Sequence, residues 1–279
     1  MRKTYFRALL SGGLLGLTLT FPQQALETAR QALSLFAVSV LPALLPFTAC
    51  MLLFTAGRTL SLPPLILLSF LGGSPAGARL FQDAKLSLKQ AKRIAAQTGV
   101  MSPMFFLGTL SLWLQSASAA RVLLCCHLLA ALCTGLFFKS DGSRAKITLP
   151  PLSFSTALPQ AAQAMLTAGA CIVLGAVAAC MLCCLFPAMP ATSSVLLQGL
   201  MEVTSGAKQL LALSFPLKMP LLSFLLSFSG VSILLQNAVF WEKQGVSLSF
   251  LMICGLLRGI IAFILCTAII LYYPAMFAV

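Results

Sequence analysis

The residue best suited to chemistry is Glu202, the only carboxylate deep within an apolar segment of the chain. An ionisable group inside a membrane segment costs several kcal/mol and predicts a function. Thr204, Ser205 and Gly206 follow it, and they offer hydroxyls and freed backbone groups at a predicted helix break. We therefore expect this segment to bind a solute, or a coupling proton or Na⁺. The alternative is a residue near the surface that Lys208 neutralises.

A second apolar segment is interrupted by glycine and proline. Residues 72–77 read Gly-Gly-Ser-Pro-Ala-Gly. In a helix interior Gly costs about 1 kcal/mol and Pro about 3 kcal/mol, so a straight helix is disfavoured here. We predict a re-entrant hairpin in which Gly73, Ser74, Pro75 and Gly77 contribute to a solute site. Broken helices present unpaired N–H groups and positive dipole ends, which suit an anion. The alternative for each glycine is close packing or a hinge.

Further polar residues lie on the predicted neighbouring helices. Ser102, Gln236 and Asn237 are candidates for lining the same cavity, although the last two would also suit the membrane face. His127 is interpreted as an interhelical hydrogen-bonding residue in preference to a proton relay. Ser102, Gln236 and Asn237 complete the predicted substrate-binding set.

The composition indicates a membrane protein. The 279 residues are 59% hydrophobic and 8% charged, whereas soluble domains carry about 25% charged residues. Apolar runs near 20 residues recur, and each is long enough to cross a hydrocarbon core of about 30 Å. Strands of a barrel would be shorter and would alternate in polarity, so the runs are helices. We predict an all-α polytopic protein in a lipid bilayer.

The net charge of +13 has a similar explanation. The basic residues form short patches between apolar runs, as cytoplasmic loops of membrane proteins do. Nucleic acid is therefore not an expected partner. The ten cysteines lie mostly within apolar runs, so we expect them to pack helices and not to bind metal. The sequence contains no phosphate loop, nucleophile elbow or HExxH motif. We expect no enzyme activity and no cofactor.

The order of the apolar runs predicts an inverted repeat. We expect a leading transmembrane helix (1–26), a first repeat (27–138), a cytoplasmic linker (139–159) and a second repeat (160–279). Each repeat holds three crossings and a hairpin, and an odd number inverts the second repeat. The amino terminus is predicted inside and the carboxyl terminus outside. The expected crossings lie near 8–26, 32–56, 99–115, 120–138, 162–186, 219–237 and 249–272, with hairpins at 62–80 and 195–213 and an interfacial amphipathic helix at 79–93.

Several ordered motifs carry a resemblance to a known family. They are Phe36–Phe47, Gly72–Phe81, Met201–Gly206 and Leu226–Gln236, and the likeness extends over about residues 26–271. In these motifs the chain resembles the YlbJ family of sporulation integral membrane proteins, also called stage V sporulation protein V.

The resemblance implies a fold and a role. The fold is the gate domain of nucleoside transporters, and the role is movement of dipicolinic acid across the outer forespore membrane. The family's Gly-x-Pro-x-Gly maps onto Gly73, Pro75 and Gly77. Its Glu-x-Thr-x-Gly maps onto Glu202, Thr204 and Gly206.

The chain also departs from the family pattern, which leaves several functions open. It is shorter than typical members, and residues 97–103 replace an Asn-rich stretch. We expect a small-molecule anion, with dipicolinate first, as the transported partner. A nucleoside-like solute and a non-transporting scaffold in spore assembly are the alternatives. A homo-oligomer or other spore membrane proteins are further expected partners.

Overall fold

The computed structural model describes residues 2–139, 146–214, 217–273 and 276. Within these residues five helices are long and apolar enough to cross a membrane. Large apolar side chains point outward, such as Leu112, which is 77% exposed, and Leu166, which is 73% exposed. Exposed apolar surface of this kind suits lipid and not water. The predicted all-α polytopic membrane architecture is confirmed. The five helices are Pro22–Thr55, Ala117–Leu136, Phe154–Leu185, Lys218–Gln244 and Leu248–Tyr272.

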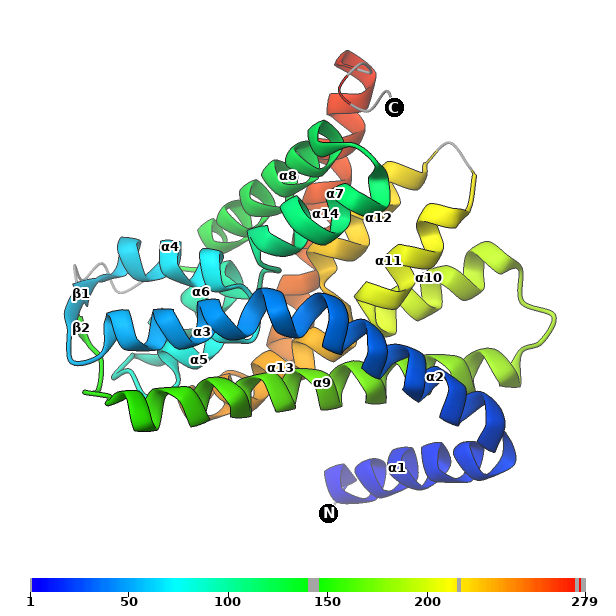
Figure 1. Cartoon of the computed structure of the whole chain (residues 1–279), viewed down its shortest axis with the longest axis horizontal. Helices are drawn as coiled ribbons and strands as arrows, with labels where there is room; N and C mark the ends of the chain where they lie inside the picture. The colour runs from blue at the N-terminus through cyan, green and yellow to red at the C-terminus, as the bar shows by residue number, and fades with distance from the viewer. Residues whose placement is uncertain (1, 140–145, 215–216, 274–275, 277–279) are drawn as a thin grey trace.

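A leading helix, α1 (Arg2–Thr20), lies beside the bundle and contacts α2 and α9 (Figure 1). The first group of elements then follows. It consists of α2 (Pro22–Leu35), a π-helical turn (Phe36–Val40), α3 (Leu41–Thr55), β1 (Thr59–Ser61), α4 (Leu62–Gly72), α5 (Ala76–Phe81), α6 (Leu88–Thr98), a second π-helical turn (Phe105–Leu110), α7 (Ser111–Leu114) and α8 (Ala117–Leu136).

The second group repeats this order. It consists of β2 (Lys146–Thr148), α9 (Phe154–Leu185), α10 (Ala191–Met201), α11 (Val203–Ala212), α12 (Lys218–Phe228), α13 (Gly230–Trp241), a 3₁₀ turn (Glu242–Gln244) and α14 (Leu248–Tyr272). Each group therefore contains a long helix, a hairpin of two short helices, an interrupted helix and a final long helix.

The two groups run in opposite directions. β1 follows α3, β2 precedes α9, and the two strands pair antiparallel with Leu60 opposite Ile147. The end of α3 therefore lies beside the start of α9, and the two helices pack together. Figure 1 shows the hairpin α4–α5 and the hairpin α10–α11 at opposite ends of this pair. This arrangement is the one expected of an inverted repeat.

Both hairpins form where the sequence predicts them. α4 ends at Gly72, and Gly73 has a positive φ of 64°, which glycine adopts without steric cost. α10 ends at Met201, and Glu202 is extended before α11 begins. Each arm has at most 11 residues, about 17 Å of helix. Neither arm is long enough to cross the bilayer.

Two predicted crossings are not continuous helices. The crossing expected at 99–115 is interrupted at residues 99–102. Ser102 precedes Pro103, whose ring disfavours helical backbone at the preceding residue. The crossing expected at 219–237 breaks at Ser229, with φ 74°, and Gly230, with φ 70°. These breaks occupy the same place in the two groups of elements.

Three helix boundaries also differ from the prediction. The leading helix ends at Thr20, because Phe21 leaves the helical region and Pro22 starts α2. The amphipathic helix expected at 79–93 is divided, because α5 ends at Phe81 and Ser87 caps a new helix. α9 begins at Phe154, inside the expected linker, of which residues 140–145 lie outside the described structure.

Candidate functional site

Each hairpin tip packs against the interrupted helix of its own repeat. The Ser74 amide donates a 2.7 Å hydrogen bond to the carbonyl of Val100. A Cβ atom on Gly73 would lie 2.4 Å from the Ser102 nitrogen, so only glycine fits. In the second repeat, a Cβ atom on Gly230 would lie 3.0 Å from the Val203 nitrogen. The four discontinuities of the helices are the two hairpin tips and the breaks in the two interrupted crossings. They therefore meet in two equivalent pairs, one in each repeat.

Side chains from three of the discontinuities, and one from the helix that follows the fourth, line one cavity. Its volume is about 30 Å³, which holds one or two water molecules, so a larger solute would enter only after the surrounding elements move apart. Ser74, Ser102 and Thr204 reach it from three breaks, and Gln236 reaches it from α13, which follows the fourth. The complete lining is Ser39, Val40, Ala43, Leu44, Ser74, Met101, Ser102, Phe105, Ile172, Thr204, Ile233 and Gln236.

Both π-helical turns of the described chain border this cavity. Ser39 and Val40 belong to the first turn, and Phe105 belongs to the second. The first turn lies just before Pro42, which has no N–H group to continue the α-helical ladder. π-helical residues are well under 1% of protein structure and gather at functional sites. Their position is independent support for the cavity as the functional site.

Asn237 and Gln236 connect the cavity wall to other elements. The Asn237 amide donates a 3.0 Å hydrogen bond to the Ser74 hydroxyl, which joins α13 to the first hairpin. The Gln236 amide donates a 3.3 Å bond to the carbonyl of Ala168 on α9. Both side chains are buried. The interpretation of these two residues as membrane-face residues is therefore wrong.

Glu202 lies at the second hairpin but not in the cavity wall. Its carboxylate accepts hydrogen bonds from the amides of Thr204, at 2.9 Å, and Ser205, at 2.7 Å. It thereby caps the amino-terminal end of α11, where a negative charge is stabilised by the helix dipole. No ion pair joins Glu202 to Lys208 among the described contacts. The buried Glu202 carboxylate is therefore stabilised by the amino-terminal end of α11 and not by Lys208.

A wide opening leads toward the cavity at the second hairpin. It has a volume of about 820 Å³ and shares Ser39 with the cavity. Its walls carry exposed Arg30 on α2 and Lys208 on α11, with Glu27 beside them. A second opening of about 260 Å³ adjoins it and contains Glu202. We call the two openings together the vestibule.

The remaining predicted glycines serve close packing. A Cβ atom on Gly77 would lie 2.1 Å from the Ser69 hydroxyl, and one on Gly206 would lie 2.1 Å from the Gly199 Cα. Each glycine lets the two arms of its hairpin approach closely. Pro75 follows Ser74 in a cis peptide bond directly before α5. Ser205 faces the vestibule and not the cavity.

Sequence reasoning missed one buried ionisable residue, Arg258 on α14. Its side chain is 1% exposed, although it lies in an apolar helix of 25 residues. An arginine inside such a run is itself a functional signal. His127 was correctly interpreted as an interhelical hydrogen-bonding residue, since its ring bonds the amide of Met101 and the hydroxyl of Ser227.

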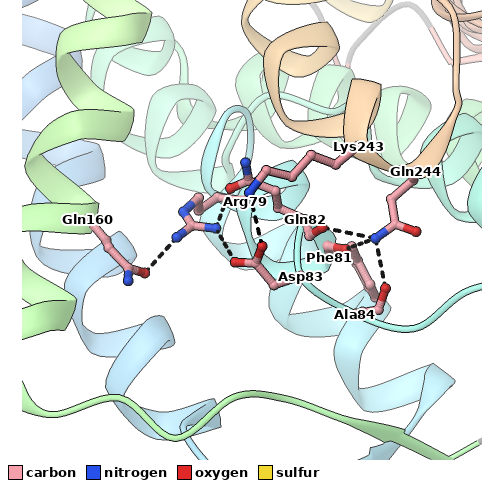
Figure 2. A network of polar contacts seen from close by, with 8 residues as sticks. All are labelled: Arg79, Phe81, Gln82, Asp83, Ala84, Gln160, Lys243 and Gln244. Atoms are coloured by element: carbon pink, nitrogen blue, oxygen red, sulfur yellow. Dashed lines mark hydrogen bonds and ion pairs between the residues drawn. The ribbon is translucent and has the colours of Figure 1, made fainter.

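A polar network closes the base of the first hairpin (Figure 2). The Arg79 guanidinium bonds Gln82, the Asp83 carboxylate at 2.9 Å and the Gln160 side chain of α9 at 2.7 Å. Lys243 approaches the same carboxylate at 3.3 Å. The Gln244 amide lies 2.7–3.1 Å from three carbonyls of the turn, those of Phe81, Gln82 and Ala84. We call this set the latch.

The latch lowers the pKa of its carboxylate. Burial raises the pKa of Asp83, but the hydrogen bonds and charges of Arg79 and Lys243 together outweigh burial and leave the pKa below the ordinary value of 3.8. The carboxylate is therefore ionised at neutral pH and keeps both cations in place. A pocket of only about 20 Å³ adjoins the latch.

Comparison with known proteins identifies one relative. The chain is 26% identical to the sporulation integral membrane protein YlbJ of Bacillus subtilis (strain 168), over 88% of this chain and 77% of that protein. No family model matches the chain, and no solved structure matches it significantly. The agreement extends over most of both proteins.

Proposed function

We propose that this chain, which is similar to the sporulation integral membrane protein YlbJ over most of its length, belongs to the family of that protein and transports a small anionic solute across a membrane of the sporulating cell. Dipicolinate across the outer forespore membrane is the first candidate. A membrane role in sporulation follows from the relative. The solute and the membrane are our proposal.

The cavity at the meeting point of four helix breaks carries this proposal. A scaffold protein has no need of interrupted helices, whereas transporters form midplane sites from them. Ser74, Ser102 and Thr204 offer hydroxyl groups there. Of the two amino-terminal helix ends beside the site, that of α11 is already capped by Glu202, whereas that of α13 has no side-chain cap and favours negative charge.

The vestibule adds an electrostatic argument for an anion. Its larger opening is lined by Arg30 and Lys208 against Glu27, while its smaller opening contains Glu202 and no basic residue, so the positive excess belongs to the larger opening. Walls with an excess of one charge raise the local concentration of the opposite ion. An anion would therefore be attracted to the entrance, and helix ends and hydroxyls would bind it further inside.

The absence of charged side chains from the cavity lining keeps a second candidate open. All twelve lining residues are uncharged, which would also suit a nucleoside-like solute. Competition separates the two solutes. Excess unlabelled nucleoside should leave the uptake of labelled dipicolinate unchanged, and inhibition by nucleoside would favour the second candidate.

The direct test is uptake of labelled dipicolinate into vesicles that contain the purified protein. Thr204→Val keeps the side-chain shape but removes a cavity hydroxyl, and we expect it to reduce uptake about tenfold, as for one lost hydrogen bond to a charged solute. Thr134→Val is the matched control, because Thr134 is equally buried but lies on α8, outside the cavity. Equal uptake by the two variants, or normal spore dipicolinate in a deletion strain, would contradict the proposal.

A further inference from the structure

Arg258 is a buried cation whose charge must be stabilised within the bundle. Its side chain is 1% exposed, and no carboxylate pairs with it among the described residues. Its Nε donates a 3.3 Å hydrogen bond to the carbonyl of Ser227, and its Nη1 donates a 3.2 Å bond to the carbonyl of Ala96. The partners are therefore two backbone oxygens from elements far apart in the sequence.

Both oxygens belong to helix ends at the two interrupted crossings. Ala96 lies in the last turn of α6, and Ser227 lies in the last turn of α12. Carbonyls in a last turn have no intrahelical partner, and a helix carries about half a negative charge at its carboxyl end. One guanidinium thus stabilises two negative helix ends, and its own charge is stabilised by them.

The backbone at the break is shaped for this arginine. A Cβ atom on Gly99 would lie 2.7 Å from Nη1 of Arg258, so any larger residue at this position would displace the guanidinium. The Ser229 hydroxyl donates a 3.4 Å bond to the carbonyl of Gly99. The two breaks are therefore joined both by Arg258 and directly to each other.

His127 of α8 completes the connection between the two breaks. It accepts a 3.0 Å hydrogen bond from the Met101 amide through Nε2, and its Nδ1 lies 2.9 Å from the hydroxyl of Ser227. Met101 and the next residue, Ser102, line the cavity. The position of the cavity wall at this break therefore depends on contacts made by α8 and α14.

We infer that Arg258 is a positioning residue of the solute cavity. It holds the carboxyl ends of α6 and α12 together, and so sets where the cavity residues after each break, Ser102 and Gln236, stand relative to each other. Arg258 acts through the backbone and does not contact the solute. The inference deepens the proposed transport function and rests on it for one of its two measurements.

The first measurement is the KM of dipicolinate uptake by variants in vesicles. We expect Arg258→Gln to raise KM about tenfold, because it loses charge-assisted hydrogen bonds that fix the cavity. The KM of Arg258→Lys, which keeps the charge but has a single donor group, should lie between those of Arg258→Gln and the unchanged protein. Arg121→Gln is the control, since Arg121 is exposed on α8 and bonds only its own helix.

The second measurement needs no transport. Amide hydrogen exchange of the full-length protein in nanodiscs should become faster at residues 97–104 and 227–231 in Arg258→Gln, while α10 keeps its protection. If Arg258→Gln does not accumulate, Arg258→Lys carries both measurements. Uptake that fails even for the unchanged protein would overturn the proposed function. The exchange result would still test whether Arg258 holds the ends of α6 and α12 together.

Two outcomes would overturn the inference. One is unchanged KM with unchanged exchange at both breaks, which would mean that Arg258 fixes nothing. The other is faster exchange throughout the helices with unchanged KM, which would mean that Arg258 supports the fold in general. Local loosening at both breaks with raised KM, graded from Lys to Gln, supports it.

Discussion

The two hairpins share a sequence pattern but have different surroundings. Gly77-Ala78-Arg79 in the first corresponds to Gly206-Ala207-Lys208 in the second. Arg79 is bound within the latch, whereas Lys208 lies exposed on the vestibule wall with no ion pair among the described contacts. A pocket of about 20 Å³ adjoins the base of the first hairpin, and the larger vestibule opening alone is about 820 Å³.

This difference makes the structure more open at the second hairpin than at the first. The vestibule shares Ser39 with the cavity, while the latch ties the first hairpin to α9 and to the turn before α14 (Figure 2). Two inverted repeats with one end open and the other closed fit transport by alternating access. The predictions below test this comparison in order of expected effect.

The largest expected effect is a difference in sidedness. Single cysteines replacing Asp83 or Lys208, in a protein whose own ten cysteines are removed, should react with an impermeant maleimide from opposite sides of the membrane. With a cytoplasmic amino terminus, the Lys208 site and a carboxyl-terminal tag should react in intact cells, and the Asp83 site only after permeabilisation. Labelling of all three from the same side would refute the inverted repeat.

The next effect concerns the glycines that pack the hairpin arms. Gly206→Ala places a Cβ atom against the backbone of Gly199, whereas Gly77→Ala meets the movable hydroxyl of Ser69. We expect Gly206→Ala to lower stability by roughly 1–3 kcal/mol and Gly77→Ala to cost less. Thermal unfolding in detergent measures both. Ser69→Gly should restore Gly77→Ala, and a failure to do so would place the strain elsewhere.

Glu202→Gln should have a smaller effect on stability but a clear effect on uptake. The amide replaces one of the two acceptor oxygens that cap α11, a change of about 1 kcal/mol. We expect normal accumulation with reduced dipicolinate uptake if Glu202 also binds the coupling proton or Na⁺. Adding Lys208→Gln should not restore uptake, because the two residues form no ion pair. Full activity of Glu202→Gln would show that the carboxylate is only a helix cap.

The smallest effect is expected at the latch. Asp83→Asn removes an exposed ion pair, and such pairs contribute about 0.2–1 kcal/mol. Because the folded pKa of Asp83 is lowered, its stabilisation is present above the ordinary carboxyl pKa of 3.8 and is lost as pH falls through the lower folded value. Unfolding midpoints of the two proteins should therefore differ at pH 7 and converge as the pH falls below the folded pKa of Asp83. Glu242→Gln, also at the surface, is the control.

The sequence by itself determined the membrane class, both hairpins and four of the five polar residues that line the cavity. Apolar runs of membrane length and a Gly-Pro cluster act locally, so they can be recognised without knowing what packs around them. Ser74 and Thr204 are predicted as polar residues at the hairpin breaks, and Ser102 and Gln236 as polar residues of neighbouring crossings. The structure brings all four to one cavity. The role of these residues in binding a solute stays a prediction.

Only the tertiary structure decided the two further breaks and the partner of each buried charge. Ser229 adopts a positive φ where its hydroxyl bonds Gly99, 130 residues away in sequence. Arg258 is stabilised by carbonyls of Ala96 and Ser227, and Glu202 by amides at its own helix end. The sequence does not show which backbone N–H and C=O groups will lack a hydrogen-bond partner within their own helix. Their availability appears only when helices end beside one another in the folded bundle.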